Sequence, residues 1–172
     1  MLKISGVILC IAGCAGYGLL QVASWKQALK ELNQWILVFQ KIRSRILYQK
    51  ETLEESCLYL GEKEDNECGK TLRKIGKRAR EERQTEFHII WKEEMGKWCK
   101  RSMLKKMTCG LLMDFPEYVK EADEELQMNL FAVFADDLYR EKEIMEKEIQ
   151  EKQKPVIAVS LIGGIMISIL LV

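Results

Sequence analysis

Six cysteines are the residues best able to do chemistry in this chain of 172 residues. Thiols paired at short spacing bind zinc, whereas thiols of a secreted domain usually form disulfides. No two of the six are separated by only two residues, and the first two lie in a segment without charged residues. We therefore expect reduced thiols, with neither a metal site nor a cofactor. The cysteines are Cys10, Cys14, Cys57, Cys68, Cys99 and Cys109.

The single histidine, His88, is the natural candidate for a general acid or base. It stands between Phe87 and Ile89, and these apolar neighbours favour a packing or surface role. The chain contains no glycine-rich phosphate loop, no Gly-x-Ser-x-Gly motif and no His-Glu-x-x-His motif. We expect a protein that is not an enzyme, with no catalytic residues and no small-molecule substrate.

Charged residues gather by sign in two blocks. Residues 70–83 carry seven basic side chains against Glu81 and Glu82, and residues 114–125 carry six acidic side chains against Lys120. Such blocks either dock an oppositely charged partner or form solvated faces that pair with each other, and we favour mutual pairing. Aromatic residues for base stacking are not interleaved with the basic block, so nucleic acid is not an expected partner.

If the chain docks on a partner protein, the acidic block is the first candidate surface. It follows the Phe115-Pro116 break, so we expect this acidic stretch to lie at an exposed end of a helical bundle. The basic block is the second candidate, because its residues have helical spacing. The candidate residues are Glu117, Glu121, Asp123, Glu124 and Glu125 in the acidic block, and Arg73, Lys77 and Arg80 in the basic block.

The two ends of the chain are apolar. Residues 4–24 and residues 155–172 contain no Asp, Glu, Lys or Arg. A helix needs about 20 residues to cross hydrocarbon, so the first segment is long enough and the second just reaches. We predict a transmembrane anchor at each end, residues 1–24 and 155–172, flanking a helical domain of residues 25–154.

The first apolar segment has two alternative interpretations. Lys3 followed by an apolar run, with small residues near Ala23, fits a cleaved signal peptide, and Ile-Ala-Gly-Cys at residues 11–14 resembles a lipid attachment site. The apolar run is longer than a usual signal peptide and continues beyond Cys14, which favours an uncleaved anchor. Either alternative would describe an exported or lipid-anchored helical protein that binds envelope partners.

Basic residues near the two anchors predict on which side of the membrane the domain lies. Five Lys or Arg residues occur within residues 26–45 and five within residues 140–154, whereas only Lys3 lies beyond the anchors. An excess of basic residues marks cytoplasmic segments. We therefore expect the domain to be cytoplasmic.

Small residues recur every four positions in both anchors, which places them on one face of each helix. Lipid supplies no hydrophobic force between helices, so close approach depends on such small residues. We expect these faces, called ridges here, to pack the anchors together or against other subunits. The alternative is that small residues are simply common in membrane helices. The ridge residues are Gly6, Cys10, Cys14 and Gly18 in the first anchor and Ser160, Gly164 and Ser168 in the second.

The domain between the anchors has a helical pattern throughout. No proline occurs between residues 25 and 115, and apolar residues recur at spacings of three and four. Thr52 and Glu55 have capping-box spacing, which predicts a helix start at residue 53. Residues 61–69 are predicted to be a solvated loop. We predict an all-α bundle whose last helix continues into the second anchor.

The ends of the chain and several interior positions carry a resemblance to a known family. Residues 1–9, MLKISGVIL, and residues 163–171, GGIMISILL, resemble the ends of stage III sporulation protein AB, a small membrane protein of endospore-forming bacteria. The resemblance spans the chain in order, although Thr52 stands where the family usually has proline. The interior positions that fit the family are Leu29, Leu32, Leu37, Ile46, Leu47, Tyr48, Leu53, Trp91, Asp123, Gln127 and Leu130.

The resemblance implies a domain similar to one domain of the F-type platform proteins of type II secretion and type IV pilus systems. It implies a platform or adaptor subunit of the sporulation channel complex between mother cell and forespore, in the outer forespore membrane on the mother-cell side. The implied partners are a cytosolic secretion-type ATPase, other membrane subunits of the complex and the lipid bilayer. The family offers no catalytic residues to carry over.

Overall fold

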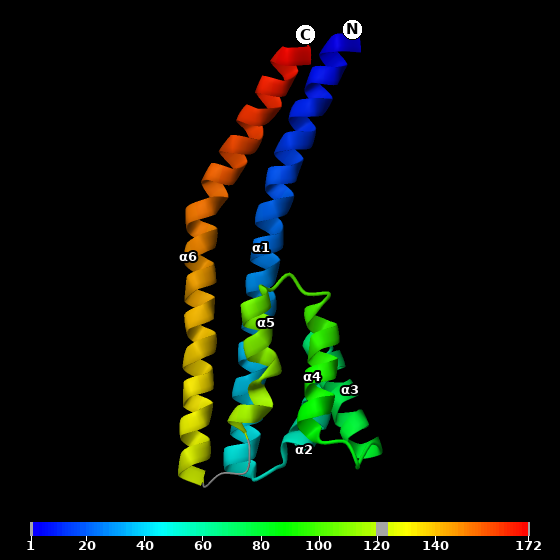
Figure 1. Ribbon diagram of the computed structural model, residues 1–172, viewed down its shortest axis with the longest axis vertical. Helices are drawn as coiled ribbons and strands as arrows, with labels where there is room; N and C mark the ends of the chain where they lie inside the picture. Colours follow the sequence, from blue (N-terminus) through cyan, green and yellow to red (C-terminus); the bar gives the residue numbers. More distant parts are fainter. Residues whose placement is uncertain (1, 120–123, 172) are drawn as a thin grey trace. The chain divides into compact units, whose positions relative to one another are not determined.

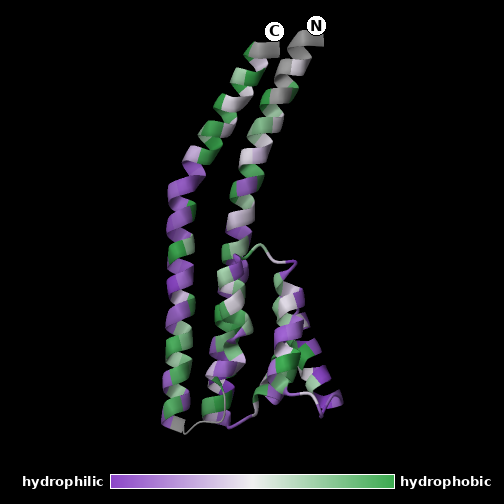
Figure 2. Cartoon of the chain, viewed as in Figure 1, coloured by the Kyte–Doolittle hydropathy of each residue, from purple (hydrophilic) through white to green (hydrophobic). Residues whose placement is uncertain are grey.

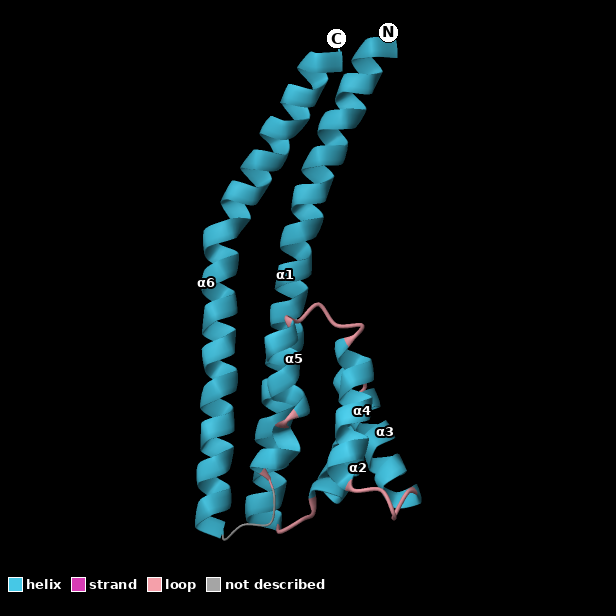
Figure 3. Ribbon diagram, in the orientation of Figure 1, coloured by secondary structure: helices cyan, strands magenta, loops and turns pink. Residues whose placement is uncertain are grey.

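The protein is all-helical in the part of the chain that the computed structural model describes, residues 2–119 and 124–171 (Figure 3). No strand occurs among these residues, so the predicted all-α fold is confirmed. The first and last helices are long, with 48 residues each, and the shorter helices lie between them in the sequence. The elements are α1 (Leu2–Gln49), α2 (Leu53–Lys63), α3 (Glu67–Glu81), α4 (Phe87–Cys99), α5 (Lys106–Met113), the 3₁₀ helix η1 (Phe115–Tyr118) and α6 (Glu124–Leu171).

The chain forms two compact units. Met1–Leu29 and Glu143–Val172 form the terminal unit, and Lys30–Lys142 form the central unit. In Figure 2 the ends of both long helices are mainly apolar, whereas the helices of the central unit mix apolar and polar residues. The predicted boundaries near residues 24 and 155 refer to a membrane and stay predictions.

In the terminal unit the outer segments of α1 and α6 lie side by side (Figure 1). They approach most closely where both ridges carry small residues. A Cβ added to Gly18 would lie 2.6 Å from the Ser160 hydroxyl oxygen, and one added to Gly164 would lie 3.1 Å from Cys14 Cβ and 3.2 Å from Ile11 Cα. The two backbones can approach this closely because these positions lack bulk.

The other ridge residues differ in their surroundings. Ser168 is buried, and its hydroxyl donates a hydrogen bond of 2.7 Å to the carbonyl oxygen of Gly164 one turn earlier. Gly6 has open space within 4 Å of the position of an added Cβ. The side chain of Cys10 lies outside the described residues. The close contacts between the two ridges therefore involve Gly18 with Ser160 and Gly164 with Cys14.

The central unit has an aromatic core around Phe115, whose side chain is fully buried. Its ring centroid lies 4.4 Å from that of Phe39 in α1, 5.2 Å from that of Trp91 in α4 and 4.9 Å from that of Phe134 in α6. Pro116 is also buried. The ring of Phe115 and Pro116 therefore pack into the core, while the next residue, Glu117, is exposed.

The start of α2 follows the predicted capping box. The backbone N–H of Glu55 donates to the Thr52 hydroxyl at 3.2 Å, and the backbone N–H of Thr52 donates to the Glu55 carboxylate at 3.0 Å. Lys50 has a φ of 55°, a left-handed conformation typical of a helix end. Helix α1 therefore stops at Gln49 and α2 starts at Leu53, although neither proline nor glycine separates them.

Helices α2 and α3 pack backbone against backbone. A Cβ added to Gly61 would lie 2.4 Å from the Arg73 backbone nitrogen, and one added to Gly76 would lie 2.9 Å from Leu58 Cα. The predicted loop over residues 61–69 is therefore wrong at its ends, and residues 64–66 alone join the two helices. Here glycine allows a close helix contact and does not break the helix.

Replacing Gly61 with alanine should destabilise the central unit. The added methyl group meets backbone atoms that cannot rotate away, so the free energy of unfolding should fall by about 1–3 kcal/mol. The measurement is thermal unfolding of the full chain in detergent, followed by circular dichroism. Gly110→Ala is the control, because an added Cβ there meets nothing within 4 Å and alanine favours the interior of α5. Equal melting temperatures for the two variants would contradict this packing.

Replacing Gly164 with leucine should separate the outer segments of α1 and α6, because the new side chain meets Cys14 and the α1 backbone. Gly163→Leu is the matched control, since an added Cβ there has open space within 4 Å. Spin labels on exposed Tyr17 and Ile162 in lipid nanodiscs report the separation as a distance distribution. We expect the distribution to broaden in Gly164→Leu alone, and an equal change in both variants would exclude a role for the ridge.

Candidate functional site

Helix α3 buries one face and exposes a basic face. Leu72 and Ile75 are fully buried, whereas Lys70, Lys74 and Lys77 are exposed. The three lysines are spaced by four and three residues, so they lie on one side of the helix. The amphipathic register of α3 thus turns the basic block of the sequence into a single surface.

Part of the basic face is hollowed into an open depression of about 420 Å³ in the central unit. We call this feature the basic depression. One acidic residue, Glu67, lies in it and pairs with Lys70 at 2.6 Å between carboxylate oxygen and Nζ. The lining therefore keeps an excess of positive charge. The lining residues are Glu67, Lys70, Thr71, Arg73, Lys74 and Lys77 from α3, and Arg101 from the segment between α4 and α5.

The cations that line the basic depression differ in whether they already form hydrogen bonds or ion pairs within the protein. Arg73 donates a hydrogen bond of 2.8 Å from Nε to the carbonyl oxygen of Gly61, near the end of α2. The side chains of Lys74, Lys77 and Arg101 make no hydrogen bond and no ion pair with the part of the chain that the structure describes. These three charges are therefore available to a partner.

Arg78 belongs to the same basic block but has a structural role. Its guanidinium group pairs with Glu82 at 2.7 Å, with Glu93 at 2.9 Å and with Glu94 at 2.8 Å, which links α3 to α4. These hydrogen bonds raise the pKa of Arg78 above its ordinary value. Burial opposes ionisation of Glu94, but hydrogen bonds from Lys97 and Arg78 lower its pKa, so the carboxylate stays charged.

Arg80, another predicted contact residue, is exposed on α3 near Glu55. Hydrogen bonds from the Thr52 backbone and hydroxyl lower the pKa of Glu55, and the positive charge of Arg80 adds to this effect. Arg80 is not among the residues that line the basic depression. Of the three predicted basic residues, Arg73 and Lys77 lie together and Arg80 lies apart from the depression.

The acidic candidate residues are only partly described. Glu117 lies 3.6 Å from the ammonium group of Lys92, and Glu125 is exposed. Glu121 and Asp123 lie outside the described residues, as does the side chain of Glu124. Within the described part of the chain, no ion pair joins an acidic candidate to a basic candidate. The mutual pairing that we favoured from the sequence is therefore not seen there.

The cysteines of the central unit fall into two pairs with different surroundings. Cys57 and Cys68 are fully buried, and burial raises the pKa of both thiols. Cys99 is partly exposed, and the sulfur of buried Cys109 lies 3.8 Å from the Ser102 hydroxyl oxygen. Among the described residues, no three His, Cys, Asp or Glu side chains gather closely enough to hold a metal ion.

The single histidine lies at the surface. His88 Nδ1 is 3.0 Å from a carboxylate oxygen of Glu86, and both side chains are accessible to solvent. These two residues also line an open surface pocket with Phe87 and Pro116. The structure therefore places His88 beside one carboxylate at the start of α4, a local arrangement that needs no other group.

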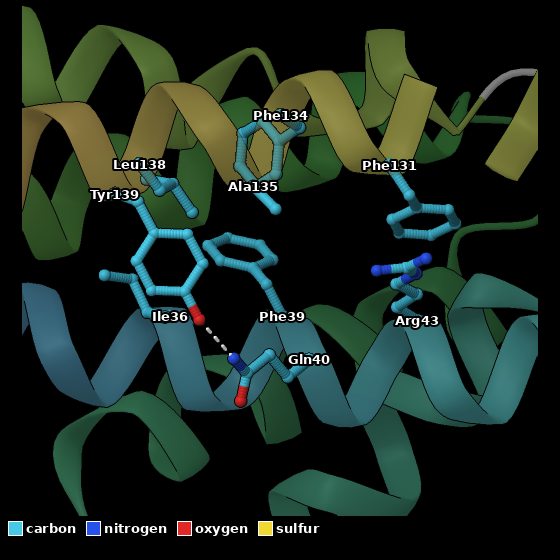
Figure 4. A pocket seen from close by; sticks show the side chains of 9 residues that line it. All are labelled: Ile36, Phe39, Gln40, Arg43, Phe131, Phe134, Ala135, Leu138 and Tyr139. Atoms are coloured by element: carbon cyan, nitrogen blue, oxygen red, sulfur yellow. Dashed lines mark hydrogen bonds between the residues drawn. The ribbon is translucent and has the colours of Figure 1, made fainter. Parts of the chain in front are cut away.

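A small apolar pocket lies between α1 and α6 within the central unit (Figure 4). Its volume is about 130 Å³, whereas ligand pockets usually have about 300–1,000 Å³. Phe39, Phe134 and Leu138 line it, and at its edge the Gln40 side-chain amide donates a hydrogen bond to the Tyr139 hydroxyl. We interpret it as a gap in helix packing, too small for most ligands.

One helix among the described residues is long and apolar enough to cross a membrane, by length and composition alone. The candidate span lies within Glu125–Ile169 of α6 and includes most of the predicted second anchor. The predicted first anchor lies in α1, where several side chains are outside the described residues. Membrane association is therefore indicated by α6.

Sequence reasoning missed three cations of the basic depression. Lys70 and Lys74 could have been found, because they stand three residues before the predicted Arg73 and Lys77 on the same helix. Arg101 could not, because only tertiary packing brings its segment to α3.

A family model matches nearly the whole chain. The family is described as stage III sporulation protein AB, and the match covers residues 3–172. The comparisons with curated proteins and with solved structures gave no match. The match agrees with the resemblance carried by the two apolar ends and by the interior positions. The chain therefore belongs to the stage III sporulation protein AB family and has a role in sporulation.

Proposed function

We propose that the protein is a non-enzymatic platform subunit of the channel complex between mother cell and forespore, and that it couples a cytosolic secretion-type ATPase to membrane subunits. The observation that carries this proposal is the basic depression, in which Lys74, Lys77 and Arg101 form no hydrogen bond or ion pair with the described residues. Family membership supplies the sporulation context. The ATPase and the platform role follow from the resemblance to the family.

An adaptor needs surface charges that are not already paired within its own fold. Arg78 is bound by three carboxylates and Arg73 by a carbonyl oxygen, so these two residues hold α3 in place. Lys74 and Lys77 then present their charges from a helix that cannot easily move. Rigid, uncompensated charge favours oriented and fast encounter with a surface of opposite sign.

The basic depression is a better docking candidate than the acidic block. Glu117 is already close to Lys92, which reduces the charge that it can offer. Pro116 and Val119 of the acidic block line an open surface pocket, but none of the acidic candidate residues lines it. We therefore place the ATPase contact at the basic depression and expect an acidic surface on the ATPase.

The membrane part of the proposal places the terminal unit in the lipid bilayer. Close packing of the two outer segments at Gly18 and Gly164 suits a helical hairpin that crosses the bilayer twice. Both connections to the domain then lie on one side of the membrane, and the flanking basic residues favour the cytoplasmic side. The domain would face the mother-cell cytosol, where an ATPase can reach it.

Reversing the charges of Lys74 and Lys77 should weaken ATPase binding. Each reversal replaces an attraction by a repulsion of about 1 kcal/mol, so the double variant Lys74→Glu, Lys77→Glu should bind about 30-fold more weakly. The affinity of the unchanged protein should fall as salt is raised, and that of the variant should change less. The measurement is binding of the purified ATPase to the full chain in nanodiscs at several salt concentrations.

The matched control is Arg83→Glu, Lys106→Glu, which changes the net charge equally at two exposed residues outside the depression. Circular dichroism of each variant checks that the helices remain. If both double variants lose the same affinity, net charge decides binding and the depression has no special role. If neither variant loses affinity, the ATPase does not bind here.

Protease added to intact cells should leave the central unit uncut. The basic residues that flank the anchors favour a cytosolic domain, whose many Lys and Arg side chains are exposed cleavage sites once the membrane is opened. Immunoblotting with a tag inserted after Gln84, in the turn between α3 and α4, reads out cleavage. Cleavage in intact cells would instead support an exported protein, and would contradict the proposed contact with a cytosolic ATPase.

A further inference from the structure

The segment between α4 and α5 carries basic and apolar residues but no acidic residue. Residues 100–107, KRSMLKKM, contain four Lys or Arg residues, two methionines and one leucine. All four basic side chains are exposed, and so are Met103, at 58%, and Met107, at 73%. Single exposed apolar residues are common on protein surfaces, but two large ones among cations are typical of segments that lie on an anionic membrane.

Contacts within the central unit hold the segment at both ends. The backbone N–H of Met103 donates a hydrogen bond of 3.1 Å to the carboxylate of Glu31 in α1. The Thr108 hydroxyl donates a hydrogen bond of 3.0 Å to the carboxylate of Glu141 in α6. Thr108 itself is fully buried. The fold therefore fixes the segment against both long helices and leaves its two methionine side chains uncovered.

Both contacts attach the segment close, along the chain, to the predicted anchors. Glu31 stands seven residues after Ser24, the last residue of the predicted first anchor, in the same helix α1. Glu141 stands 14 residues before Pro155, the first residue of the predicted second anchor, in the same helix α6. At 1.5 Å per residue, these separations are about 10 Å and about 21 Å along the helices. The chain thus keeps the segment near the lipid headgroups.

The cations of this region have the number and place that favour anionic lipid. Lys26 and Lys30 are exposed on α1 just after the predicted first anchor, and they add to the four basic residues of the segment. Clusters of roughly four to eight Lys or Arg residues beside a membrane helix are typical of binding to anionic headgroups. Arg101 also lines the basic depression, so we assign the lipid contact to the other exposed residues.

We propose that residues 100–107 form a peripheral membrane contact, in which Met103 and Met107 enter the headgroup layer of an anionic bilayer and Lys100 and Lys106 bind lipid phosphate groups. The proposal rests on the membrane placement of the two anchors proposed above. It goes beyond the ATPase contact, because the partner of this surface is lipid. A third attachment to the bilayer, besides the two anchors, would limit how the central unit turns at the membrane.

Hydrogen exchange of the full chain in nanodiscs tests the contact. The first N–H groups of a helix have no partner within that helix, so those at the start of α5 exchange quickly unless lipid covers them. We expect residues 104–108 to exchange several-fold more slowly in discs of phosphatidylcholine with a third of phosphatidylglycerol than in discs of phosphatidylcholine alone. Residues 82–86, the turn between α3 and α4, should exchange equally in both discs.

A pair of double variants separates the segment from general changes of charge and hydropathy. Lys100→Glu, Met107→Glu removes one cation and one apolar contact, so the difference between the two kinds of disc should disappear at residues 104–108. Arg83→Glu, Ile89→Glu is the matched control, because it changes one exposed cation and one exposed apolar residue outside the segment. Both new glutamates at positions 107 and 89 lie in the first turn of a helix, where an acidic residue is favourable.

Each outcome decides for or against the lipid contact. Equal exchange of residues 104–108 in the two kinds of disc overturns it, as does equal loss of protection in the two double variants. The ATPase is absent from this experiment, so these results leave the proposed ATPase contact intact. If the chain does not stay with the lipid when the discs are purified, both the lipid contact and the membrane part of the proposed function are overturned.

Discussion

Burial of Phe115 is the interaction on which the arrangement of the central unit depends. Its ring contacts α1 through Phe39, α4 through Trp91 and α6 through Phe134, so one side chain connects three helices. Replacing a buried phenylalanine with alanine typically costs about 3–5 kcal/mol, a large share of the stability of a small domain. The 3₁₀ helix that carries Phe115 exists because this contact holds it, since Pro116 prevents α5 from continuing.

Polar contacts then decide which surfaces the core leaves to solvent. Trp91, beside Phe115, donates a hydrogen bond of 3.0 Å from its indole to the Leu112 carbonyl oxygen, which attaches α5 to α4. Arg78 attaches α3 to α4 through carboxylates, and the glycine contacts attach α2 to α3. Helix α3 thus has its apolar face, two of its arginines and Lys70 occupied from within the molecule, and exposed Lys74 and Lys77 are left for a partner.

The basic depression depends on one short segment outside α3. Residues 100–105 connect α4 to α5, and they include Arg101, which lines the depression, and Ser102, whose hydroxyl donates to the Cys99 carbonyl oxygen at the end of α4. The net charge of the chain is only +1. Association must therefore be directed by local uncompensated charge and not by the overall charge of the protein.

Sequence patterns alone determined the helical class, the capping box at Thr52 and the family. These features are local: apolar spacing at three and four residues, a hydroxyl three residues before a carboxylate, and two ends without charge. The basic face of α3 was partly predictable, because helical spacing places Lys77 and Arg73 close together.

Features that depend on packing between distant parts of the chain were decided only by the tertiary structure. It turned the Phe115-Pro116 break into the centre of the core, used Gly61 for a helix contact and not for a loop, and brought Arg101 to α3. Each of these outcomes depends on which distant surface competes for the residue, since burial and close packing can outweigh local preference by a few kcal/mol. A single sequence specifies the local preferences directly, whereas the partners of a residue follow only from the fold of the whole domain.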